Sequence, residues 1–195
     1  MLKHVLLLFV LIGCHQDIDP RAVAKNNAAV ELVKYELLGV RDEVTFLRAI
    51  SLLDTAIQID SSYRLAYVNK AQFLCKIGKQ KEAIRTIEVL NAREPNSPSG
   101  FLLLGMIFDQ IGDTASANRN YLFTIQFYQN KMLNGERLTI SQRLDIAYTR
   151  LFLDKPAAID ELEGILTENP DLPNADIHRE SFRSFDRKTY IESLK

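Results

Sequence analysis

Apolar residues recur at three- and four-residue spacing along most of this chain, from about residue 27 to residue 168. This period places them on one face of a helix, and no run alternates residue by residue as a half-buried strand would. Helix-breaking residues interrupt the pattern at Gly39, Gly78, Gly112, Gly135 and Pro156. The pattern therefore predicts an all-α fold built from consecutive helices.

Two consecutive stretches of the chain repeat each other. Residues 66–96 align with residues 100–130 without a gap, at an offset of 34. The matched positions keep their size and character: Tyr67 with Phe101, Ala71 with Gly105, Leu74 with Phe108, Gly78 with Gly112, Ala83 with Ala117, and Ile87 with Tyr121. Small residues let two antiparallel helices approach closely, large ones fill the space beside them, and glycine suits the positive φ that ends a helix. The repeat therefore predicts helix hairpins.

This unit resembles the tetratricopeptide repeat, a 34-residue helix-turn-helix described by the pattern W-x2-L-G-x2-Y, then A-x3-F, then P. Residues 101–121 match most of that pattern. The resemblance implies an antiparallel helix-hairpin solenoid of about three to four repeats, with full copies at 64–97 and 98–131. Weaker copies of the second helix lie near residues 49–60 and 158–170, where terminal repeats are expected to be atypical.

One linker and one helix are expected after the repeat domain, which we assign to residues 27–170. Residues 171–176 contain Pro173 and predict the linker. Beyond it, four apolar residues fall roughly on one face of a helix: Phe182, Phe185, Ile191 and Leu194. We expect the segment 171–195 to cap the last repeat. Because basic residues lie among the apolar ones, a partner-binding or surface-bound basic helix is the alternative.

The amino-terminal residues differ from the rest of the chain. An apolar run over residues 5–12 follows a short basic start, is too short to span a bilayer, and is typical of a signal peptide. The residues that follow, LIGC at 11–14, resemble the lipobox of bacterial lipoproteins. This resemblance implies that residues 1–13 are removed and that Cys14 carries the acyl chains that anchor the protein to a membrane. The alternative is a buried element with an incidental cysteine.

A tether is expected between this site and the repeats. Residues 14–26 are polar, contain Pro20 and lack a sustained helical period. Fully extended, they would hold the folded domain up to about 40 Å from the lipid.

Composition and charge limit the remaining functions. A formal net charge of −1, with both signs interspersed, lacks the basic stripe that nucleic-acid binding requires, so no nucleic-acid partner is expected. Lipidation of Cys14 would leave Cys75 without a partner for a disulfide, and we expect Cys75 to be a small buried apolar side chain.

The residues that catalysis would need are sparse. After removal of the leader only His15 and His178 remain, one beside the anchor and one alone in the predicted linker region, which gives a nucleophile–histidine arrangement little support. The chain has no metal-ligand spacing and no phosphate-binding glycine loop, so neither a metal nor a cofactor is expected. Acidic residues near one helix start are expected to form a solvated face: Asp160, Glu161 and Glu163. We therefore expect no enzyme activity.

A binding surface remains as the candidate site. In tetratricopeptide proteins the first helix of each repeat lines a concave groove, and the resemblance implies lining residues at equivalent positions of the two copies: Leu65, Val68, Gln72 and Cys75, then Ser99, Leu102, Met106 and Asp109. Leu102 and Met106 are apolar where such a groove meets solvent, and methionine adapts its shape to partners. The alternative is that both pack against the terminal helix or another repeat. Tetratricopeptide proteins that bind a C-terminal carboxylate use Lys, Arg and Asn residues at set groove positions. Only one of these residues, Asn69, is present here, so we do not expect this mode of binding.

These expectations combine into a functional hypothesis. The protein would be a non-catalytic scaffold or adaptor in a bacterial envelope assembly, anchored through Cys14 and presenting its groove to a protein or peptide partner. It would face the periplasm or the cell exterior. By resemblance to enterobacterial lipoproteins, the presence of His15 and not an acidic residue directly after the cysteine favours the outer membrane. Two alternatives remain: an immunity or inhibitor lipoprotein that neutralises one toxin or enzyme, and an accessory subunit for glycan or peptidoglycan handling.

Overall fold

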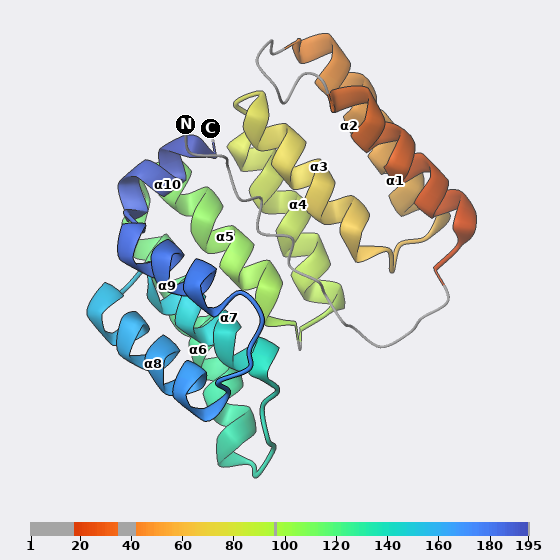
Figure 1. Ribbon diagram of the computed structural model, residues 1–195. Helices are drawn as coiled ribbons and strands as arrows, with labels where there is room; N and C mark the ends of the chain where they lie inside the picture. The colour runs from red at the N-terminus through yellow and green to blue at the C-terminus, as the bar shows by residue number, and fades with distance from the viewer. Residues whose placement is uncertain (1–17, 35–41, 96, 195) are drawn as a thin grey trace.

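The computed structural model describes residues 18–34, 42–95 and 97–194, and all regular secondary structure within them is helical (Figure 1). The helices, in chain order, are α1 (Pro20–Val33), α2 (Glu43–Ile59), α3 (Arg64–Lys76), α4 (Gln80–Arg93), α5 (Pro98–Gln110), α6 (Thr114–Leu133), α7 (Ile140–Arg150), α8 (Lys155–Glu168), α9 (Ala175–Ser184) and α10 (Arg187–Ser193). The predicted all-α fold class is confirmed.

The helices form a stack of hairpins. Each helix from α1 to α8 packs against the next one in the chain, which gives the pairs α1–α2, α3–α4, α5–α6 and α7–α8. Figure 1 shows these pairs side by side, from α1–α2 at one end of the molecule to α7–α8 at the other. Contacts also join helices that are not consecutive, among them α1 with α3 and α5 with α10. The fold is a helical-hairpin repeat in which each unit is stabilised mainly by its neighbours.

Only the two central hairpins follow the 34-residue period. The helices α3 and α5 begin 34 residues apart, as do α4 and α6. The outer hairpins are spaced more widely, since α1 begins 44 residues before α3 and α7 begins 42 residues after α5. Gly78 and Gly112 end α3 and α5 with φ values of 76° and 80°, which residues with a side chain rarely adopt. The predicted turns are therefore confirmed.

A close helix approach within the α5–α6 hairpin depends on Gly105. A Cβ atom at this position would lie 2.4 Å from Cε1 of Tyr121, whose ring is fully buried. In α3–α4 the equivalent residues are Ala71 and Ile87, both fully buried in one apolar cluster. The α5–α6 hairpin therefore has the small-against-large packing that the repeat predicts, and α3–α4 buries a small and a large residue at the same two positions.

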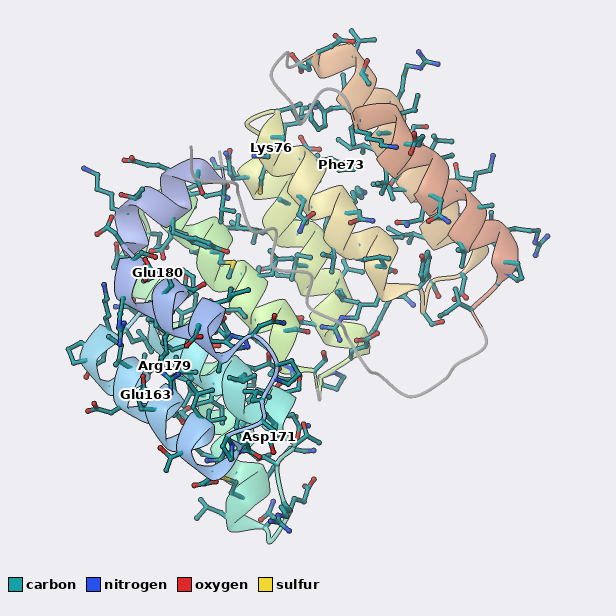
Figure 2. The ribbon with its side chains drawn as sticks, viewed as in Figure 1. Phe73, Lys76, Glu163, Asp171, Arg179 and Glu180 are labelled. Carbon is teal, nitrogen blue, oxygen red and sulfur yellow. The ribbon has the colours of Figure 1, made fainter. Side chains whose placement is uncertain are left out.

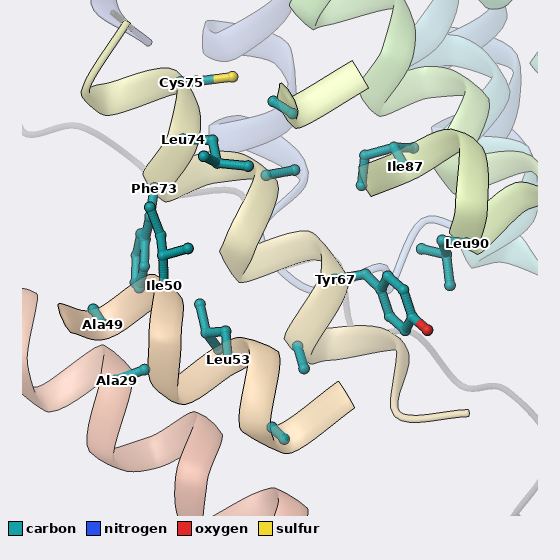
Figure 3. Packing of buried hydrophobic residues seen from close by; sticks show 14 of the residues in the cluster. Ala29, Ala49, Ile50, Leu53, Tyr67, Phe73, Leu74, Cys75, Ile87 and Leu90 are labelled. Atoms are coloured by element: carbon teal, nitrogen blue, oxygen red, sulfur yellow. The ribbon is translucent and has the colours of Figure 1, made fainter. Parts of the chain in front are cut away.

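The largest apolar cluster runs from α1 to α5. Figure 3 shows its packing, with Ala49, Ile50 and Leu53 of α2 between the side chains of α1 and α3. The rings of Phe46 and Phe73 meet edge to face, with centroids 5.7 Å apart. Separate clusters join α7, α8 and α9, and α5, α6 and α10. A chain of smaller clusters, in place of one central core, is what a stacked repeat is expected to have.

The predicted tether is wrong from Pro20 onward, because α1 begins there. Asp19 caps the helix by accepting a hydrogen bond from the amide of Arg21 at 2.8 Å. Asn26 is 1% exposed and its Oδ1 accepts a hydrogen bond from Nδ2 of Asn69 on α3 at 2.8 Å. A polar residue, Asn26, thus occupies a core position of α1 and interrupts the apolar period in the sequence. Residues 14–17 and Cys14 itself lie outside the described residues.

The expected single C-terminal helix is in fact two. Phe185 adopts extended backbone angles, φ −60° and ψ 126°, and Asp186 caps a new helix by accepting from the amide of Thr189 at 2.8 Å. Phe182 of α9 is buried among residues of α7 and α8, so α9 caps the last hairpin as predicted. In Figure 2, Arg179 of α9 lies beside Glu163 of α8, and their Nε and Oε1 atoms are 3.0 Å apart.

Candidate partner-binding surface

The predicted groove residues of α3 divide into an exposed and a buried set. Leu65 is 43% exposed, and Gln72 is also exposed. Val68 is half-buried against the α1–α5 cluster, and Cys75 is buried within it. On this helix the residues open to a partner are therefore Leu65 and Gln72, with part of Val68.

The predicted groove residues of α5 are covered. Leu102 is 4% exposed and Met106 is 9% exposed, so the expectation that they face solvent is wrong. Both belong to the apolar cluster that includes Ile191 of α10 and Phe152, which follows α7. The alternative that they pack against the terminal helix is confirmed. Ser99 is half-buried, with its hydroxyl 3.3 Å from that of Ser97.

Asp109, at the end of α5, holds α10 by a two-point ion pair. Arg187 donates from Nη2 to Oδ1 of Asp109 at 2.6 Å and from Nε to Oδ2 at 2.9 Å. Its third nitrogen, Nη1, donates to the carbonyl oxygen of Phe152 at 2.6 Å. The Asp109 side chain is 7% exposed. A planar guanidinium suits such a carboxylate because both oxygens are engaged at once.

Tyr121 of α6 completes this polar centre. Its hydroxyl donates to Oδ2 of Asp109 at 2.8 Å, and the Arg187 guanidinium lies 5.4 Å from the centre of its ring. Burial and then the hydrogen bond to Asp109 raise the pKa of Tyr121 far above its usual range, so it acts only as a donor. The ring also stacks on Phe152, with centroids 4.6 Å apart.

The chain matches no protein-family model and no curated protein. Arg187 lies 78 residues from Asp109 in the chain, so no local sequence pattern indicates this pair. In the sequence, the pair is reflected only in the basic residues that lie among the apolar ones of the segment 171–195.

A second carboxylate, Asp145 of α7, has a similar tyrosine but no cation. Tyr128 of α6 donates to Oδ2 of Asp145 at 3.0 Å. Among the described residues none forms an ion pair with Asp145. Burial raises the pKa of Asp145 to about 6, and the hydrogen bond from Tyr128 only partly opposes this effect.

The other reactive side chains are engaged in structure. Burial raises the pKa of Cys75 to about 12, so its thiol stays protonated, and the prediction of a buried apolar role is confirmed. The interpretation of His178 as isolated in a linker is wrong. It lies on α9, with Nδ1 2.7 Å from the hydroxyl of Tyr148 on α7, and burial lowers its pKa. Within residues 18–34, 42–95 and 97–194, no three His, Cys, Asp or Glu side chains are grouped to hold a metal ion.

The described residues also form a cavity away from the predicted groove. A shallow cavity of about 450 Å³ lies among α2, α3 and α4, but none of the predicted groove residues lines it. An ion pair between Lys70 and Asp54, at 2.5 Å, belongs to its lining.

None of the helices in the described part of the chain combines the length and apolar character that crossing a bilayer would need.

Proposed function

We propose that this protein is a non-catalytic scaffold or adaptor that binds protein segments along the first helices of its hairpins. The observation that carries this proposal is the seat of α10 on α5, because a short amphipathic helix is already held there by Leu102, Met106 and Asp109. A surface of this chemistry, an apolar patch ending in a carboxylate, suits helical peptide ligands. The resemblance of residues 64–131 to two tetratricopeptide repeats supports the same role.

Membrane anchoring through Cys14 is the second part of the proposal. It is supported by the LIGC sequence at 11–14 after a short apolar run. The lipid would confine the protein to an envelope membrane, facing the periplasm or the cell exterior, and so raise its local concentration near partners. Cys14→Ala should leave an unprocessed precursor that takes up no labelled fatty acid. Normal maturation of that variant would contradict the anchor.

A matched pair of variants tests the binding role. Leu65 on α3 and Val89 on α4 are 43% and 48% exposed, so aspartate at either position should leave the fold intact, but only Leu65 is a predicted groove residue. Each full-length variant is used to capture partners from detergent-solubilised membranes, with identification by mass spectrometry. We expect Leu65→Asp to lose the partner that the wild type and Val89→Asp retain. Equal capture by all three proteins would contradict the proposed groove.

The same experiment distinguishes the other classes of function. An inhibitor or immunity protein should yield one tightly bound partner and no larger complex. An accessory subunit for glycan handling should instead show thermal stabilisation by glycan fragments. No contact in the described residues favours either of these classes over a scaffold.

A further inference from the structure

The contact between α10 and α5 has the composition of a peptide–receptor contact. One side chain, Arg187, donates to both carboxylate oxygens of Asp109 and to a main-chain carbonyl. With α10 in place the Asp109 side chain is almost entirely removed from solvent, and Arg187 is its ion-pair partner. A helix that covers Asp109 in this way therefore needs a cation at this point to balance the carboxylate.

The apolar half of the contact is equally specific in position. Ile191 is buried in the cluster that contains Leu102 and Met106, and Tyr190 and Leu194 pack against the same cluster. The ring of Tyr190 meets that of Phe152 at nearly right angles, with centroids 5.6 Å apart. Relative to Arg187, these three residues stand three, four and seven positions later, the spacing of a single helix face.

The helix α10 depends on this surface for its own stability. It has seven residues, and an isolated helix of that length is unstable in water. The extended backbone at Phe185 separates it from α9. That junction is held by Lys155 of α8, whose Nζ donates to the carbonyl oxygens of Arg183 and Phe185 at 2.7 and 2.8 Å. This anchor lies before α10 in the chain, so it holds the end of α9 through contacts that do not involve α10.

We propose that the surface under α10 is a docking site for a helical segment of a partner protein, and that α10 occupies it until such a segment displaces it. The segment that fits carries arginine, an aromatic residue three positions later, and aliphatic residues four and seven positions later. The charge of Asp109 and the composition of α10 specify this occupant. The inference rests on the proposed binding function and adds to it the chemistry of the ligand and the exchange with α10.

The test uses the full chain and a fluorescent peptide that carries residues 185–195. In the wild type, α10 competes with the peptide, so binding is weak. Arg187→Glu places a like charge against Asp109 and releases α10, and the apparent Kd for the peptide, measured by fluorescence anisotropy, should fall about tenfold or more. Lys188→Glu is the matched control: it makes the same charge change at the exposed neighbouring position and should bind as weakly as the wild type.

Two further reagents keep the result specific. The peptide with Arg187→Glu should not bind the released chain, and Asp109→Asn added to that chain should abolish binding of the original peptide. Where Arg187→Glu lowers the helical circular dichroism, Ile191→Ala is used in its place, since it weakens the docking of α10 without a new charge.

A folded variant that binds the peptide no more tightly than the wild type would overturn the proposal. So would a released chain that forms a dimer by light scattering, because the occupant would then be α10 of a second copy. The measurement needs neither lipid nor a cellular partner. Peptide binding without any Leu65-dependent capture from membranes would refute the proposed function alone, and the reverse result would refute this inference alone.

Discussion

Two partly buried carboxylates, Asp109 on α5 and Asp145 on α7, accept hydrogen bonds from tyrosines of the same helix, α6. The hydroxyl of Tyr121 lies 2.8 Å from Asp109, and that of Tyr128 lies 3.0 Å from Asp145. They differ in the third partner, because Asp109 alone has the guanidinium of Arg187. At Asp109, α10 supplies a cation. At Asp145 no ion-pair partner lies among the described residues, and burial raises the pKa of the carboxyl to about 6.

The largest expected effect comes from filling the space beside Gly105, into which the ring of Tyr121 packs. Gly105→Ala would bring a methyl group to 2.4 Å from a buried ring, so the ring or α5 must shift. We expect a loss of about 3 kcal/mol in the free energy of unfolding, measured by chemical denaturation. Gly164→Ala on α8, where nothing lies within 4 Å, is the control and should stabilise by up to about 1 kcal/mol. Equal stability of both variants would contradict the close packing.

Asp145 should make stability depend on pH. Its unfolded pKa is about 4 and its folded pKa is about 6, so the folded state holds a proton that the unfolded state has released. Stability should therefore fall as pH rises from 4 to 6 and stay lower above that range. Asp145→Asn should remove this fall and stabilise the protein at pH 7 by up to about 2 kcal/mol. Denaturation at a series of pH values measures it, with exposed Asp160→Asn as the unchanged control.

Arg187→Ala should make Asp109 resemble Asp145. Since Arg187 is partly exposed, we expect a modest cost of about 1 kcal/mol in the free energy of unfolding. The amides of α10 should lose their protection against hydrogen exchange, while those of α5 keep theirs. Lys188→Ala should change neither quantity. Retained protection in the Arg187 variant would show that the ion pair does not hold α10.

The smallest effect concerns Cys75, which occupies in α3 the repeat position that Asp109 occupies in α5. Its thiol is buried and its raised pKa, about 12, keeps it protonated at pH 8. In a chain with Cys14→Ala, we expect no reaction with a disulfide reagent within minutes until denaturant is added. Rapid modification of the folded chain would mean that this part of α3 is open.

The central hairpins could be predicted because each rule there is local. Gly78 and Gly112 end helices with positive φ, and Gly105 faces the large ring of Tyr121 one helix later. The start of α1 could not be predicted, because Asn26 is a polar residue in a core position and its partner Asn69 is 43 residues away. Apolar periodicity predicts a helix from its apolar face, and a polar residue in a core position, such as Asn26, interrupts that periodicity.

The covered half of the binding surface was equally inaccessible to sequence reasoning. The repeat positions of Leu102 and Met106 predict groove residues, but what lies over them depends on the extended backbone at Phe185, which ends α9 before α10 begins. The local signal for a second helix is the capping residue Asp186, within an otherwise helical pattern. The contact that this helix makes joins residues 78 positions apart.

Hydrogen exchange of the wild-type chain, titrated with the peptide of residues 185–195, tests the central claim most directly. If α10 and a partner segment use the same surface, the amides of α10 should lose protection in proportion to peptide binding, while those of α5 and α9 remain protected. Bound peptide with fully protected α10 would contradict the account, because the two helices would then occupy different places.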